Sequence, residues 1–369
     1  MMESSDVLSV YCNVINYEMA RHSVEEDDVK TAIRRVKYAY LPQRKWLPVM
    51  YCTNLLERTA DCCAYLHLYA PLHTSLVYYV MNLAVSEMRE WFRTFLSICE
   101  PLKICSLGGG PGTDIIGVVT ALQREFGCFY TSAKILDIIS DWNIIFGSVT
   151  DEITSGCYGD IGKCLTWEFF KWSLITTNLL NEMDPDVDDT IKTADFVIMS
   201  KFISAISSRG ASKMIQNIFK RMKPGAVLLY IDNDGGRHHK LVSKIAGECC
   251  LVPLIRPLQH LKYSNEALRI KRFGSWSCCE TKITVQIMEK RSGFLSVWNY
   301  FPSPQVEKNY WDTYLQNFRF MSGRNRRHRG LHSDDFERLS RLRRKKIKHR
   351  RNRKLHFEDF RSLSAKIDI

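Results

Sequence analysis

The feature that most constrains the fold of this chain is the run from Ile104 to Asp114, in which an apolar stretch ends in a glycine-dense turn and an amphipathic helix follows directly. Glycine accepts positive φ and lets backbone N–H groups approach a ligand without a clash from Cβ. The helix expected from Thr113 adds unpaired N-terminal N–H donors. The run therefore predicts a strand, a turn and a helix that bind a nucleotide-like ligand. The glycines of the turn are Gly108, Gly109, Gly110 and Gly112.

The spacing of these glycines is unsuited to two common nucleotide loops. A dinucleotide fingerprint needs a third glycine three positions after the second, where this chain has Thr113 or Ile115. No Lys-Ser or Lys-Thr pair follows the glycines, so the phosphate loop of ATP and GTP enzymes is absent. The pattern GxGxG thus fits NAD poorly.

Three later segments continue an alternation of strands and helices. Residues 133–137 are a short apolar stretch ending in Asp137, and a carboxylate about 20 residues after such a turn accepts both ribose hydroxyls of a nucleoside. Residues 195–200 form an apolar strand pattern, and residues 223–232 are a Pro-Gly turn that leads into a buried strand. Expected strands near 103–107, 132–137, 173–179, 195–200 and 226–232 alternate with helices near 113–125, 141–147 and 211–222.

In this order and spacing, residues 100–290 resemble the class I S-adenosylmethionine-dependent methyltransferases, whose first motif is a strand ending in a GxGxG turn. The resemblance implies S-adenosyl-L-methionine as the cofactor. It also implies a closing antiparallel hairpin, with a strand at 282–289 and a partner near 268–273. The turn has a weaker similarity to eukaryotic ribosomal RNA base methyltransferases. The cofactor-binding residues that we carry over are Gly108, Gly109, Gly110, Gly112, Asp114, Asp137 and Asn178.

Two positions depart from the family's pattern. Most members carry an acidic residue two positions before the first glycine, where this chain has Ser106. Asp114 is a candidate to supply that carboxylate, although it is equally suited to cap the N-terminus of the following helix. Asn178 stands where an acid commonly meets the adenine amino group, and an amide oxygen also accepts that bond.

Residues 1–100 form a helical N-terminal extension by their periodicity, with apolar residues three and four apart in 29–40 and 83–98. N-terminal helices in this superfamily often cover the cofactor or shape the acceptor pocket. Tyr65, His67 and Tyr69 are therefore candidates for contact with substrate, with core packing as the alternative for each.

The sequence gives little evidence on catalysis. Methyl transfer is an in-line displacement in which positioning supplies most of the rate, and a base is needed only when the acceptor is protonated. Lys201, at the expected tip of the fourth strand, is a candidate to neutralise an anionic acceptor, or else a surface or helix-capping lysine. The adjacent His238 and His239 make an unconvincing metal cluster, so we expect no metal.

Composition restricts the setting in which the protein acts. The 13 cysteines include three adjacent pairs and no CxxC, which favours reduced thiols and a cytosolic or nuclear compartment. No run of about 18 apolar residues appears, and the first residues lack a secretory pattern, so we expect neither a membrane span nor secretion.

Charge is concentrated near the C-terminus. Residues 322–354 hold 15 Lys and Arg against 3 Asp and Glu, while the rest of the chain has 37 of each sign. Such clustering attracts polyanions by counterion release and resembles a nuclear or nucleolar import signal, with a solvated tail lacking a specific partner as the alternative. We therefore expect RNA and import factors as partners and a nuclear or nucleolar location, or else the cytoplasm.

The expected fold is α/β, a Rossmann-like doubly wound, mostly parallel sheet with an N-terminal helical extension and a basic C-terminal tail. Its parts are the extension 1–100, the S-adenosylmethionine-binding domain 101–295, an aromatic-rich segment 296–321 and the tail 322–369. The favoured function is methylation of RNA. A methyltransferase of proteins or small molecules, or an inactive S-adenosylmethionine-binding scaffold, which Ser106 permits, are the alternatives.

Overall fold

The computed structural model describes residues 2–39, 55–156, 158–165, 168–206, 208–234 and 238–292. The chain divides into two compact units, Met1–Leu295 and Ser296–Ile369, and all of the described residues lie in the first. The aromatic-rich segment 296–321 and the basic tail 322–369 lie outside the described residues, so these two expectations stay predictions.

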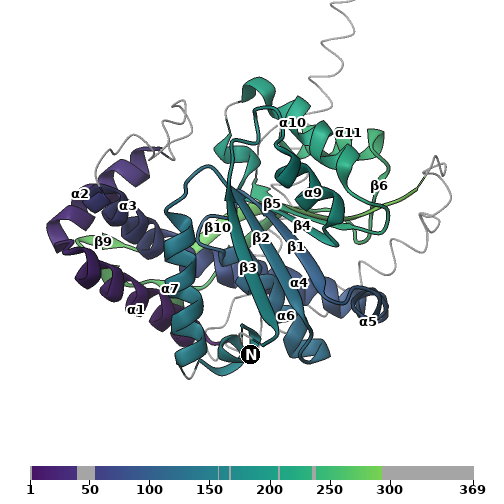
Figure 1. The fold of residues 1–369 in the computed structure, drawn as a ribbon. Coiled ribbons are helices and arrows are strands. Elements are labelled where there is room, and N and C mark those ends of the chain that lie inside the picture. Colours follow the sequence, from purple (N-terminus) through teal and green to yellow (C-terminus); the bar gives the residue numbers. More distant parts are fainter. Residues whose placement is uncertain are drawn as a thin grey trace, which may run out of the picture. The chain divides into compact units, whose positions relative to one another are not determined.

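A mostly parallel β-sheet forms the centre of the first unit (Figure 1). The strand order is β3-β2-β1-β4-β5-β10-β6, and β7 also pairs with β10. Strands β1 to β5 are parallel, and β10 runs antiparallel to β5, β6 and β7. This is the Rossmann-like sheet that the sequence predicts. The strands are β1 (Leu102–Leu107), β2 (Thr131–Asp137), β3 (Phe170–Thr176), β4 (Phe196–Ser200), β5 (Val227–Asn233), β6 (Leu251–Pro253), β7 (Leu258–Ser264) and β10 (Glu280–Lys290).

Helices cover both faces of the sheet because successive side chains of a strand point to opposite faces. Ile104 and Ile198 join one core with α6 (Thr113–Phe126) and α7 (Trp142–Ser155). Their neighbours Cys105 and Val197 join the other core with α9, α10 and α11. The other helices that follow β1 up to β6 are α8 (Gly159–Cys164), α9 (Pro185–Thr193), η2 (Ile203–Ala205), α10 (Ser208–Arg221) and α11 (His238–Glu248).

The N-terminal helices share the core of the α6 face. Helix α4 is apolar on nearly all sides and packs against α6. Gly117 allows this close approach, because a Cβ there would lie 2.8 Å from the Cβ of Val77 and 2.9 Å from the carbonyl oxygen of Thr74. The hydrophobic core of the extension is therefore continuous with that of the sheet. These helices are α1 (Ser4–His22), α2 (Glu26–Ala39), α3 (Leu55–Leu68), α4 (Ala70–Glu87) and α5 (Arg89–Ile98).

The closing hairpin is present, but the predicted partner strand at 268–273 is wrong. The partner of β10 is β7, with Tyr263 opposite Thr281. A shift in register and a positive φ at His260 interrupt the alternation of β7, which hid this strand in the sequence. Residues 268–273 instead contain part of η3 (Glu266–Leu268) and the strand β8 (Lys271–Arg272), which pairs with β9 (Ser275–Trp276). Phe273 and Gly274 between them both have positive φ, as a two-residue hairpin turn requires.

Two other boundaries differ from those predicted. The third strand ends at Thr176, which places Asn178 in the loop after it. The helix expected over 83–98 is divided, because Met88 leaves helical geometry at φ −125° and ψ 37° and so separates α4 from α5. None of the described helices is both long enough and apolar enough to span a membrane.

Candidate cofactor and acceptor site

A cavity of about 440 Å³ lies at the carboxyl ends of the parallel strands, between the sheet and the N-terminal helices. In open α/β sheets, ligands bind at this edge, where the connections from neighbouring strands diverge, here between β1 and β4. One wall, the turn side, is lined by Gly108, Gly110, Asp137 and Asn178. The opposite wall, the helix side, is lined by Arg58, Asp61, Cys62 and Tyr65 of α3 and by His73 of α4.

The glycines of the turn serve two different purposes. Gly108, Gly110 and Gly112 all have positive φ, between 51° and 71°. A Cβ would lie 2.4 Å from Phe202 at Gly108 and 2.2 Å from Phe146 at Gly112, so packing inside the protein requires both glycines. The nearest atoms to a Cβ at Gly110 belong to Trp142, at 3.8 Å, and both residues line the cavity. A side chain at Gly110 would therefore occupy space that a ligand can use.

Asp137 joins the second strand to the glycine turn. Its Oδ2 accepts a hydrogen bond from the backbone N–H of Gly110 at 2.9 Å, and its Oδ1 accepts one from Ile139 at 2.9 Å. Burial raises the pKa of Asp137, and the backbone N–H donors partly oppose that rise. The carboxylate lines the cavity, where a carboxylate oxygen can also accept a hydrogen bond from a ligand hydroxyl.

Asp114 and Ser106 form a buried pair beside the turn. The Ser106 hydroxyl donates to Asp114 Oδ2 at 2.6 Å, and the N–H of Ile115 donates to Oδ1 at 2.8 Å. Burial raises the pKa of Asp114 to about 6. Gly112 occupies the N-cap of α6, so Asp114 acts within the first turn of the helix and not as its N-cap. Neither residue lines the cavity. Asp114 thus places a carboxylate directly beside Ser106, the position at which the resemblance implies an acidic residue.

Asn178 and Gly109 occupy the edges of the turn side. The side-chain oxygen of Asn178 accepts a hydrogen bond from the N–H of Leu180 at 3.1 Å, which fixes the loop after β3. Asn178 lines the cavity, as its predicted contact with a ligand requires. Gly109 is outside the lining, and a Cβ there would meet the Ser106 hydroxyl at 2.2 Å. Gly109 therefore leaves room for the Ser106 and Asp114 pair.

One face of helix α3 lines the helix side of the cavity. Arg58, Asp61, Cys62 and Tyr65 follow one another at intervals of three, one and three residues, the spacing of a single helical face. Arg58 forms an ion pair with Asp141 at 3.3 Å, and Asp61 forms one with Arg35 at 2.8 Å. These ion pairs tie the α3 face to α2 and to the start of α7.

Aromatic rings and a histidine complete the helix side. The Tyr65 ring lies 5.3 Å from Trp142, and the Tyr65 hydroxyl lies 3.3 Å from His73 Nδ1. Burial, with a smaller contribution from the Lys201 charge, lowers the pKa of His73 to about 3. His73 is therefore neutral at ordinary pH and presents one ring N–H and one acceptor nitrogen.

Of the four substrate-side candidates from the sequence, the structure brings Tyr65 and Lys201 to the cavity. His67 is buried outside the lining, with Nε2 at 3.1 Å from the carbonyl oxygen of Ser275 and its ring edge-to-face with Phe273. Tyr69 is also outside the lining and stacks on His73 at 5.9 Å.

Sequence reasoning missed several lining residues. Arg58, Asp61 and Cys62 could have been found from Tyr65 by helical spacing, because they share its face. His73 and Trp142 could not, since only tertiary packing brings α4 and α7 to the cavity. Among the described residues, no group of three or more His, Cys, Asp or Glu is placed to hold a metal ion.

Comparison with known proteins gives structural similarities only. No family model matches the sequence, and no curated protein matches it. Among solved structures, the chain is similar to an O-methyltransferase family protein from Burkholderia thailandensis, at 17% identity over 75% of this chain and 72% of that one, with a TM-score of 0.39.

Two further similar structures contain a ligand. Magnesium protoporphyrin IX methyltransferase from Synechocystis PCC 6803, with bound S-adenosylmethionine, is 15% identical over 61% of this chain and 84% of its own, with a TM-score of 0.36. The N-methyltransferase NodS from Bradyrhizobium japonicum, in complex with S-adenosylhomocysteine, is 10% identical over 71% and 99%, with a TM-score of 0.34. All three are named as methyltransferases.

Proposed function

We propose that this protein is an S-adenosylmethionine-dependent methyltransferase. The observation that carries the proposal is the turn side of the cavity, where a glycine of positive φ and a buried carboxylate face the same space at the ends of β1 and β2. Asp137 would hold the ribose hydroxyls, Asn178 would lie near the adenine, and the turn around Gly110 would leave room for the methionine part. The bound molecule would supply an electrophilic methyl group.

The space and the donors of the cavity fit such a ligand. A volume of about 440 Å³ lies within the range of roughly 300–1,000 Å³ usual for sites of small ligands. Around Asp137, the lining of the turn side is mainly apolar and includes Leu136, Ile138 and Leu179. These side chains suit the flat face of a purine. The helix side is left for the methyl acceptor.

We assign the acceptor to RNA on the basis of two basic regions. One is the segment 322–354, with its 15 Lys and Arg. The other is the β8–β9 hairpin, where the half-exposed Trp276 has the guanidinium of Arg269 at 5.1 Å and the ammonium of Lys271 at 5.9 Å from its ring. Exposed aromatic rings beside cations stack with the bases of single strands and attract their phosphates.

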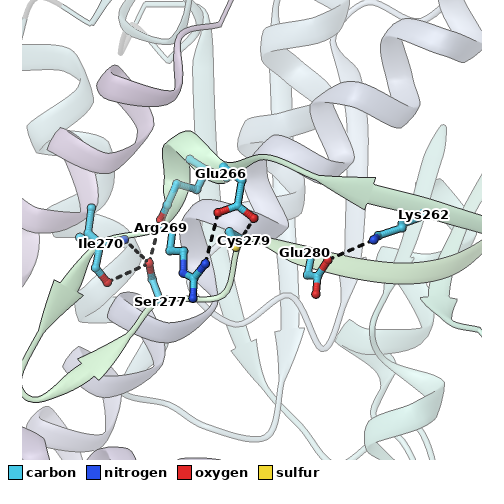
Figure 2. Close-up of polar contacts among 8 residues, drawn as sticks. Lys262, Glu266, Arg269, Ile270, Ser277, Cys279 and Glu280 are labelled. Atoms are coloured by element: carbon cyan, nitrogen blue, oxygen red, sulfur yellow. Dashed lines mark hydrogen bonds and ion pairs between the residues drawn. The ribbon is translucent and has the colours of Figure 1, made fainter. Parts of the chain in front are cut away.

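The hairpin is firmly attached to the domain. At its base, the Ser277 hydroxyl donates to the Leu268 carbonyl at 2.7 Å and accepts from the N–H of Ile270 at 2.9 Å, as Figure 2 shows in part. Its tip contacts α2 and α3, through Lys37 to the Ser275 hydroxyl at 2.6 Å and through His67. These same helices contribute Val36 and Tyr65 to the cavity, so RNA held at the hairpin would lie beside the helices that line the acceptor wall.

The decisive experiment incubates the protein with tritiated S-adenosylmethionine and with fractionated RNA, protein and small-molecule pools. Label in the RNA pool supports the whole proposal. Label only in protein or small molecules would retain the methyltransferase and overturn the RNA acceptor. Calorimetry without S-adenosylmethionine binding would overturn the activity itself.

The two basic regions are tested separately. Trp276→Ala should weaken RNA binding by about 1–3 kcal/mol, the usual contribution of one stacked base. Tyr130→Ala is the matched control, because Tyr130 is 49% exposed against 50% for Trp276 and lies away from the hairpin, beside Phe169. Equal losses in both variants would contradict a specific role for Trp276.

Removal of all residues after Met321 should leave S-adenosylmethionine binding intact, since the sheet and the glycine turn lie upstream. RNA affinity should fall, and the slope of log affinity against log salt should flatten because fewer counterions are released. A fluorescent fusion of the truncated chain should shift from the nucleus or nucleolus to the cytoplasm. An unchanged salt slope would remove the tail from the RNA interface.

A further inference from the structure

Lys201 stands at the cavity in an unusual backbone conformation. It follows directly after β4, lines the cavity and has φ of +55°, a region that residues other than glycine rarely adopt. Its own N–H donates to the carbonyl of Ile231 at 2.7 Å, which holds the strained residue in place. Strained residues of this kind are found disproportionately at functional sites, where the surrounding structure holds them.

Two side chains fix the ammonium end of Lys201. Nζ donates to Asn233 Oδ1 at 2.5 Å and to Thr281 Oγ1 at 2.9 Å. The amide nitrogen of Asn233 donates in turn to the Ser204 hydroxyl at 3.1 Å, so its oxygen is the atom that faces the lysine. Residues from β5 and β10 thus hold Nζ from two directions.

The two acceptors on Nζ are compatible with either protonation state of Lys201. A charged lysine carries three N–H donors. Among the residues that the structure describes, only two acceptors contact Nζ, and both are neutral. A neutral amine can satisfy both with its two N–H groups. Neither acceptor carries a charge that would hold Lys201 in its ammonium form.

The charged and titratable groups around Lys201 come from three elements. Burial lowers the pKa of Lys201 to about 8, while Asp232 of β5 and Cys278, just before β10, act in the opposite direction. His73 of α4 faces it as well and is neutral, with its pKa lowered to about 3. A substantial fraction of Lys201 is therefore an amine in mildly alkaline solution.

We propose that Lys201 is the general base of the methyl transfer and that the acceptor atom carries a proton, as an N–H or O–H group. This proposal rests on the proposed function. The acceptor atom forms a bond to the methyl carbon while the carbon–sulfur bond breaks and leaves its electron pair on sulfur. The proton of the acceptor moves to the lone pair of Nζ, and the resulting ammonium later releases it to water.

A general base at Lys201 restricts the acceptor to groups that carry a proton. A thioether or an unprotonated ring nitrogen attacks a methyl group without a base, so Lys201 would give it no advantage. A ring N–H, an exocyclic amine or a hydroxyl gains from proton removal. If Lys201 instead held an anionic acceptor by its charge alone, any permanent cation of similar reach would replace it.

The first test needs no acceptor. Full-length protein is labelled with trace acetic anhydride between pH 6 and 10, and peptides containing Lys201 are compared by mass spectrometry with the exposed Lys244 as an internal reference of reactivity. We expect the reactivity of Lys201 to rise with a midpoint near pH 8. A midpoint above about pH 10, the ordinary range for lysine, would overturn the base.

The second test compares Lys201→Arg with Lys201→Met in the label-transfer assay on the three pools. Arginine keeps the charge but does not lose its proton in proteins. Both variants should lose about 100-fold or more of the transfer rate, the usual contribution of a general base. The wild-type rate should rise with pH to a plateau near 8, and both variants should lack this rise.

The outcomes separate this inference from the proposed function. A wild-type protein that binds no S-adenosylmethionine contradicts the proposed function. A wild-type protein that transfers methyl groups, with Lys201→Arg as fast and with the same pH profile, contradicts the base alone and leaves the methyltransferase standing. Both variants should retain S-adenosylmethionine affinity within about twofold, a change smaller than one net hydrogen bond.

Discussion

The turn side and the helix side of the cavity are built in different ways. The turn side consists of the glycine turn after β1, the carboxylate of Asp137 at the end of β2 and Asn178 in the loop after β3, so the sheet itself determines its shape. The helix side consists of side chains on α3 and α4, which precede the sheet in the chain and reach the cavity only by packing. A ligand on the turn side is therefore specified by the fold, and a ligand on the helix side by the particular residues of the extension.

The largest effect should come from Gly110→Val. The new side chain would enter the cavity and oppose the positive φ of 51°, so S-adenosylmethionine binding should fall below detection by calorimetry. Gly127→Val is the control, because Gly127 also has positive φ, at 84°, and a Cβ there would meet nothing within 4 Å. If the two variants lose affinity equally, backbone strain and not the cavity explains the loss.

A smaller loss should follow Asp137→Ala. Removing a carboxylate that accepts the ribose hydroxyls should weaken S-adenosylmethionine binding by roughly 1.5 to 3 kcal/mol. That loss corresponds to a factor of about 10 to 150 in the dissociation constant. Asp137→Asn checks the bonds to Gly110 and Ile139, since its one oxygen retains one of them. Undiminished affinity in both variants would remove Asp137 from the site.

Substitutions on the helix side should change the rate of methyl transfer more than the affinity for S-adenosylmethionine. Tyr65→Phe removes the hydroxyl that lies 3.3 Å from His73 and keeps the ring next to Trp142. Methyl transfer should slow by about fivefold, the equivalent of one net hydrogen bond near 1 kcal/mol. S-adenosylmethionine affinity, measured by calorimetry on the same variant, should stay unchanged. A larger loss of affinity than of rate would place Tyr65 with the turn side.

The same contrast explains what the sequence could predict. The glycine turn, the five strands β1 to β5 and the positions of Gly110 and Asp137 follow from local patterns, because each strand and the residues that end it form one continuous segment of chain. The pairing of β7 with β10 was missed since a bulge near His260 breaks the alternation. His73 and Trp142 carry no local pattern that distinguishes them from core residues, and only the packing of α4 and α7 brings them to the cavity.

Asp114 was the position that the sequence left undecided between ligand and helix terminus. The structure turns its carboxylate toward Ser106 and away from the cavity lining. We therefore expect Asp114→Asn to bind S-adenosylmethionine with unchanged affinity, the smallest effect of this series. A clear loss of affinity without a change in melting temperature would instead show that the carboxylate reaches the ligand's ammonium group.

The effect of Asp114→Asn should appear in the dependence of stability on pH. The folded-state pKa of Asp114 is about 6, above the unfolded value of 3.8, because burial disfavours the charged form. The native state therefore binds more protons than the unfolded state between these values, and the wild-type free energy of unfolding falls as pH rises from about 4 to 6. Asparagine does not titrate, so the variant should gain in melting temperature relative to wild type across this window and keep that gain at higher pH. Calorimetric melting of both proteins from pH 4 to 8 measures the difference, and parallel curves would mean that Asp114 ionises as freely in the folded chain as in the unfolded one.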